Sequence, residues 1–196
     1  LIGALAFGKA TPYLLRALQI DQWQSIVWIS SIGALLAAVL VGGLYRNGPF
    51  PFPKRQFSFA LVIEVFRDSK TKLAIGGYLG HMWELYAMWV WIGVFLTVAA
   101  RASNISEVIV DFSTFTVIAF GAVGCIVGGK LADQFGRERF VNISMAVSGL
   151  CCLLIGICAA VNFWLCIGVA LVWGFFVVAD SAQFSTLVTE VSPQHA

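Results

Sequence analysis

Two long stretches without a charged residue restrict this chain more than any other feature of its sequence. The first covers residues 26–45, which is twenty residues, and the second covers residues 140–179, which is forty. About twenty apolar residues are enough for an α-helix to cross the hydrocarbon layer of a bilayer. The shorter stretch therefore predicts one membrane-spanning helix, and the longer stretch predicts two.

The composition agrees with a membrane protein. Hydrophobic residues make up 60% of the chain and charged residues 11%, whereas soluble domains have roughly 45–50% and 25%. We therefore expect an all-α, polytopic helical membrane protein in a lipid bilayer. The net charge of +2 is too small to indicate a nucleic-acid partner. Six transmembrane helices are expected, at residues 1–18, 23–46, 72–100, 107–130, 140–160 and 163–189.

Basic residues are distributed unequally between the two ends of these helices. One end carries nine of them: Arg46, Lys54, Arg55, Arg67, Lys70, Lys72, Lys130, Arg137 and Arg139. The opposite end carries Arg16 and Arg101. Short cytoplasmic loops retain Lys and Arg, so residues 47–71 and 130–139 are predicted to be cytoplasmic in a multi-pass protein of the inner or plasma membrane.

The connection at residues 47–71 is the longest between the expected spans. It begins with Pro49, Pro51 and Pro53, and proline prevents helix formation there. Within residues 57–68, the apolar side chains of Phe59, Val62, Val65 and Phe66 stand against the charged Glu64, Arg67 and Asp68. This pattern is typical of a short amphipathic helix at a membrane surface; a disordered loop is the alternative. We interpret 47–71 as a linker between two membrane domains, residues 1–46 and 72–196.

A dense polar cluster, residues 128–139, interrupts the apolar segments and predicts a tight loop at the membrane surface. Within it, the order Gly129-x-Leu131-x-Asp133-x-x-Gly136-Arg137 resembles the G-x-L-x-D-x-x-G-R signature of the major facilitator superfamily. Gln134 and Glu138 stand where that family commonly has basic residues. We call residues 129–139 the signature segment.

The resemblance implies a twelve-helix transporter with two domains that acts as a monomer when full length. Two spans, a long basic linker and four more spans resemble helices five to ten of that fold, so the chain is expected to be an internal fragment. The signature segment would then act as a latch that biases which side is open. Its implied gating residues are Gly129, Leu131, Asp133, Gly136, Arg137 and Arg139. The alternative is a tight turn that only keeps positive charge inside.

Ionisable side chains at membrane depth are the best candidates for transport chemistry, because an isolated charge there is costly. Glu84 is the first candidate for proton coupling and Asp180 the second. His81 lies three residues before Glu84, so the two share a helix face, and Gln183 adds an amide near Asp180. Lys9 is a further candidate. The alternatives are a hydrogen bond from an aromatic residue or an ion pair with Lys9 for Glu84, and a site at the cytoplasmic mouth for Asp180.

Aromatic residues are dense in the same span. Trp83 and Tyr86 flank the charged positions and could stack on a solute, although packing is the more common role of such side chains. The five cysteines all lie in apolar segments without metal-ligand spacing to histidine, and we interpret them as small buried apolar residues. No metal or cofactor is expected.

Together these features predict a secondary active transporter that works by alternating access and is proton-coupled. A lysine at the midplane suits an anionic solute, and residues 8–14 lack the glycine-rich pattern that drug and proton antiporters of the family carry in helix five. An efflux transporter of the same family, a channel and a membrane receptor are the alternatives. An enzyme would need a nucleophile with a positioned base or a metal cluster, and the spacing of the residues offers neither.

Overall fold

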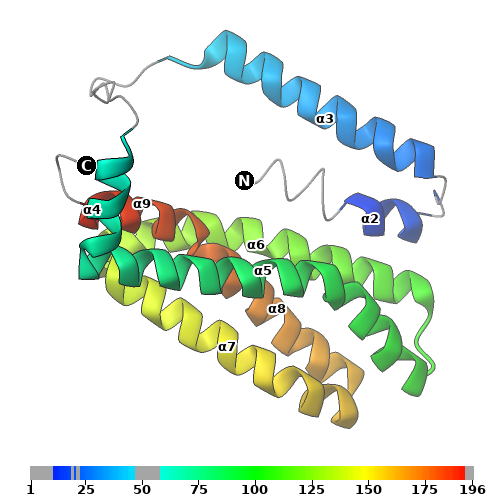
Figure 1. The fold of residues 1–196 in the computed structure, drawn as a ribbon. Coiled ribbons are helices and arrows are strands. Elements are labelled where there is room, and N and C mark those ends of the chain that lie inside the picture. The colour runs from blue at the N-terminus through cyan, green and yellow to red at the C-terminus, as the bar shows by residue number, and fades with distance from the viewer. Residues whose placement is uncertain (1–10, 19, 21–22, 47–57, 193–196) are drawn as a thin grey trace.

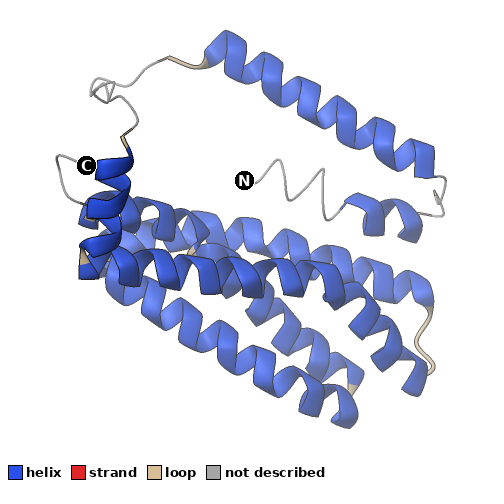
Figure 2. Ribbon diagram, in the orientation of Figure 1, coloured by secondary structure: helices blue, strands red, loops and turns tan. Residues whose placement is uncertain are grey.

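The computed structural model describes residues 11–18, 20, 23–46 and 58–192. Every regular element in these ranges is a helix (Figure 2). In chain order they are α2 (Thr11–Ala17), α3 (Trp23–Leu44), α4 (Phe59–Arg67), α5 (Ser69–Ala102), α6 (Glu107–Phe135), α7 (Arg137–Val161), α8 (Phe163–Ala179) and α9 (Ser181–Val191) (Figure 1).

Five segments of the described chain are long and apolar enough to cross a membrane. They are Trp23–Leu44, Ser69–Ala102, Glu107–Phe135, Arg137–Val161 and Phe163–Val191. Five of the six predicted spans are thus confirmed as helical segments, four of them as single helices, and the fold is that of a polytopic helical membrane protein. The remaining predicted span, residues 1–18, falls largely outside the described residues, and its end forms α2.

The helices α5 to α9 form one bundle, with α2 alongside it, whereas α3 lies apart (Figure 1). Short connections between long helices make successive helices antiparallel. Along α5 the buried residues recur every three or four positions, which is one face of a helix. That face includes His81, Leu85, Met88, Ile92 and Leu96, so His81 is carried into the interior by the same periodicity that builds the core.

A helix, α4, lies within the segment 57–68 for which an amphipathic helix is predicted, and it ends directly before α5. Asp68 separates the two helices and caps α5, because its carboxylate accepts hydrogen bonds from the amide and the hydroxyl of Thr71 at 2.7 and 2.6 Å. These bonds hold the pKa of Asp68 below its ordinary value. The position of α4 at a membrane surface remains a prediction.

The prediction of a loop over residues 128–139 is wrong, because most of these residues are helical. Helix α6 continues to Phe135 and α7 begins at Arg137, so Gly136 alone forms the connection. Its φ of 88° lies in the region that favours glycine, which allows the chain to reverse within one residue. The polar residues of the signature segment are consequently fixed on two helices.

The predicted single helix at 163–189 is also corrected. It is interrupted at Asp180, which ends α8 and precedes α9. The Asp180 amide donates to the carbonyl of Val178, two residues back, instead of continuing the helical pattern of hydrogen bonds. A predicted candidate residue therefore occupies the one interruption within this span.

Candidate functional site

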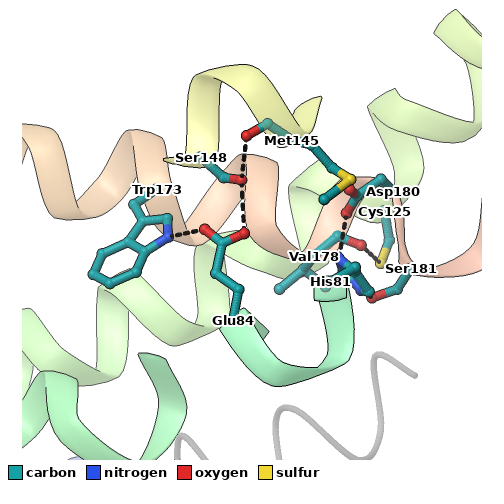
Figure 3. A network of polar contacts seen from close by, with 9 residues as sticks. All are labelled: His81, Glu84, Cys125, Met145, Ser148, Trp173, Val178, Asp180 and Ser181. Atoms are coloured by element: carbon teal, nitrogen blue, oxygen red, sulfur yellow. Dashed lines mark hydrogen bonds and ion pairs between the residues drawn. The ribbon is translucent and has the colours of Figure 1, made fainter. Parts of the chain in front are cut away.

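The structure brings two of the predicted ionisable residues into direct contact. Nδ1 of His81 lies 3.2 Å from Oδ1 of Asp180, and each side chain is only 1% exposed. Nε2 of the same imidazole lies 2.9 Å from the hydroxyl oxygen of Ser181 (Figure 3). A protonated imidazole beside a carboxylate would carry no net charge as a pair, which would make its burial in an apolar bundle tolerable.

A side chain on α6 contacts the backbone at the helix interruption. The thiol of Cys125 donates a hydrogen bond to the carbonyl of Val178, with 3.5 Å between sulfur and oxygen (Figure 3). Helix α6 approaches closely here, since a Cβ on Gly128 would lie 2.7 Å from the carbonyl oxygen of Ala179. The interruption is therefore supported from α6 by one hydrogen bond and by close backbone packing.

Aromatic rings cover His81 on the side of α9. The Phe184 ring centroid lies 5.2 Å from that of His81 and 5.8 Å from that of Tyr78. Phe184 is 2% exposed. Gly77 makes room for this ring, because a Cβ at Gly77 would come within 3.0 Å of it.

Glu84 lies one turn along α5 and has different partners. Its Oε1 accepts a hydrogen bond of 2.8 Å from the indole of Trp173 on α8, and its Oε2 accepts one of 3.2 Å from Ser148 on α7 (Figure 3). The alternative that the sequence left open, a hydrogen bond from an aromatic residue, is what the structure shows. One turn before Ser148, the buried hydroxyl of Ser144 has no hydrogen-bond partner within the described part of the chain.

The other predicted candidates lie outside the contacts of His81, Asp180 and Glu84 described above. Gln183 is buried, and its amide nitrogen would lie 3.9 Å from a Cβ on Gly129 of the signature segment. Trp83 and Tyr86 are 81% and 55% exposed and line a shallow depression along α5. Lys9 lies outside the described residues.

The signature segment contacts the end of α9. Arg137 donates through NH1 to Asp133 at 3.1 Å, and its Nε lies 3.1 Å from a carboxylate oxygen of Glu190. Arg137 therefore links α6, α7 and α9. Leu131 is partly buried, while Arg139 is exposed.

Several residues of the site were not predicted from the sequence. Ser148, Trp173, Ser181 and Phe184 complete the contacts of Glu84 and His81. Of these four residues, only Phe184 could have been predicted from the sequence, because it lies one helical turn after Asp180 and so shares the same helix face. The other contacts join different helices, and spacing along one helix does not reveal them.

Within the described ranges, no group of three or more His, Cys, Asp or Glu side chains could hold a metal ion. The cysteines are all free, and they range from buried, at Cys151 and Cys166, to exposed, at Cys152. The interpretation of all five as buried apolar residues is therefore too broad.

A bundle of membrane-spanning helices around buried ionisable side chains defines a polytopic membrane protein of the transport class. Over residues 1–196 the chain matches the Major Facilitator Superfamily. The chain belongs to this family and is a membrane transporter. No curated protein and no solved structure matches it.

Proposed function

We propose that this protein is a secondary transporter that moves a small polar, anionic solute by alternating access, coupled to protons through the His81–Asp180 pair. The observation that carries the proposal is the burial of this pair at the interruption of a membrane-spanning segment. Ionisable residues inside membrane spans are rare and mark ion or proton pathways. The anionic preference rests on Lys9 in the sequence.

The geometry supports a coupling mechanism in which Asp180 accepts a proton. Protonation would remove the negative charge that holds the imidazole of His81 at 3.2 Å and would weaken the contact between α5 and the α8–α9 junction. Because α8 ends at Asp180, the change would act at a point where the helical hydrogen-bond pattern is already interrupted. Helix α9 would then transmit it to Arg137 through Glu190, 3.1 Å away.

In this proposal, Glu84 has a secondary role. Its carboxylate accepts two hydrogen bonds from neutral donors, so it is positioned by α7 and α8 rather than paired with a titratable group. Residues 1–46 and 72–196 would belong to the two membrane domains, joined by the linker 47–71 on the cytoplasmic side. The protein would function as a monomer.

The test uses the full-length protein in liposomes and a solute found by screening small organic and inorganic anions. Asp180→Asn removes the titratable group at nearly constant size, so we expect uptake driven by a proton gradient to fall at least about tenfold, or about 1.4 kcal/mol. Solute exchange without a gradient should continue, because it does not require net proton release. Both rates are measured as initial rates of labelled solute.

Asp111→Asn is the matched control, because Asp111 is also ion-paired, with Arg16 at 2.9 Å, but lies at the opposite end of the bundle. It should transport at the wild-type rate. Gradient-driven uptake at the wild-type rate in both Asp180→Asn and Glu84→Gln would show that neither carboxyl group couples transport to protons.

A further inference from the structure

A pocket of about 400 Å³ lies between α5, α7 and α9. It is found at the end of the bundle where the signature segment connects α6 to α7. Its lining includes the first residues of α5 and α7 and the last residues of α9, so it extends from this end toward the middle of the bundle. The pair itself is 1% exposed and does not line the pocket.

The lining residues form successive layers one helical turn apart. Lys70 of α5 and Glu138 of α7 form the mouth and are exposed. Gly77, Met145 and Phe184 form the deepest layer on α5, α7 and α9. Since each helical turn advances about 5.4 Å, the pocket becomes apolar within two turns of its charged mouth.

The next turn inward holds the buried pair. His81 follows Gly77 by four residues on α5, and Asp180 precedes Phe184 by four residues. Both helices therefore place the pair directly beyond the deepest lining residues, about 5.4 Å further along the bundle.

Phe184 is the side chain that separates the two. It lines the pocket, and its ring also packs against the imidazole of His81, with 5.2 Å between the ring centroids and a tilt of 33° between the rings. Gly77 has no side chain to compete with the ring, since a Cβ there would lie 3.0 Å from its Cε1 atom. The ring thus occupies the space between water at the mouth and the buried imidazole.

We propose that this pocket is the proton entry path to the His81–Asp180 pair and that the Phe184 ring is its gate. The volume is enough for several water molecules, and Lys70, Glu138 and Asn142 can hold them near the mouth. Movement of the ring lets water reach the imidazole, and its return closes the path. The coupling part of this statement rests on the proposed function.

The test measures how fast water-borne reagent reaches His81. The full-length protein in liposomes, without solute or gradient, is treated with diethyl pyrocarbonate, and carbethoxylation of His81 is followed by peptide mass spectrometry. In the wild type we expect a slow reaction, because the imidazole is buried. Phe184→Ala should accelerate it at least about tenfold, since reaction of a buried group is limited by the free energy of opening.

Phe163→Ala is the matched control. Phe163 is also 2% exposed, but it lies at the start of α8, far from the pocket. Its truncation should leave the reaction of His81 at the wild-type rate. Equal acceleration by both substitutions would mean that general loosening of the bundle exposes His81. This result would overturn the proposal that Phe184 is the gate.

A second variant tests whether water reaches His81 through the pocket, independently of the Phe184 ring. Met145→Trp adds volume in the deepest layer of the pocket, so combining it with Phe184→Ala should return the reaction of His81 to near the wild-type rate. An undiminished rate in the double variant would show that water reaches the pair by another route. If Phe184→Ala does not fold, Phe184→Leu replaces it and should change the rate in the same direction.

These outcomes are independent of the transport assay. Acceleration by Phe184→Ala together with normal gradient-driven uptake by Asp180→Asn would confirm the water path and reject the coupling role. The opposite combination, no acceleration and lost coupling, would keep the coupling role and reject Phe184 as the gate.

Discussion

Glycine residues determine how closely α6 and α8 approach each other. A Cβ on Gly124 would lie 2.2 Å from the carbonyl oxygen of Phe175, and one on Gly174 would lie 2.2 Å from that of Val117. No side chain fits at such distances, so the two backbones are in direct contact. This contact continues to Gly128 beside Ala179, and it thereby positions the residue that precedes Asp180.

Gly124→Ala should therefore destabilise the protein by about 1–3 kcal/mol, the usual effect of overpacking. The backbone of Phe175 has to move to accept the added methyl group. Thermal unfolding of the purified protein in detergent measures the change as a lower Tm.

Gly149→Ala provides the comparison, because a Cβ at Gly149 would meet nothing within 4 Å. In the interior of a helix this substitution should stabilise by about 0.5–1 kcal/mol. Equal Tm values for the two variants would contradict the close packing of α6 on α8.

At the scale of elements, α9 connects the buried pair to the signature segment. Asp180 at its start contacts His81, and Glu190 near its end contacts Arg137. The hydroxyl oxygen of Thr71 on α5 also lies 3.3 Å from the carbonyl oxygen of Val191. A short helix held at both ends is suited to couple a local change at one end to the other.

Arg137→Ala should change transport more than stability. Its ion pairs are partly exposed, so their loss should cost less than about 1 kcal/mol of folding free energy. A similar change in the equilibrium between access states alters their ratio about fivefold. We therefore expect an altered uptake rate at a nearly unchanged Tm, measured on the same preparation in liposomes and detergent.

Lys130→Ala removes the same charge within the same segment, at an exposed position that is not among the implied gating residues, and should transport as the wild type does. If Arg137→Ala and Lys130→Ala lower transport equally, the signature segment would contribute only its positive charge.

For the whole molecule, the distribution of charge predicts its orientation. Arg16 and Arg101 lie toward one end of the bundle, and Arg67, Lys70, Arg137 and Arg139 lie toward the other (Figure 1). The excess of basic residues predicts that this second end faces the cytoplasm.

Membrane-impermeant thiol labelling of intact cells checks this orientation. A cysteine at Arg101 should be labelled from outside, and a cysteine at Arg139 should be labelled only after the cells are opened, each in a protein whose own cysteines are replaced by serine or alanine. The reverse pattern would invert the topology.

The sequence by itself was enough to predict the class of fold, the five described spans and α4, because a helix in a bilayer satisfies its backbone hydrogen bonds within its own segment. It also predicted that His81 and Asp180 lie at membrane depth. Depth depends only on the number of residues from a helix end.

Only the tertiary structure decided which faces of the helices meet. The rotation of each helix and the distance between neighbours depend on side-chain packing and on glycines such as Gly124. In the packed bundle His81 contacts Asp180, and Glu84 accepts hydrogen bonds from Trp173 and Ser148. The span from α8 to α9 is interrupted at Asp180. Gly136 alone connects α6 to α7, because one residue with positive φ is enough to reverse the chain.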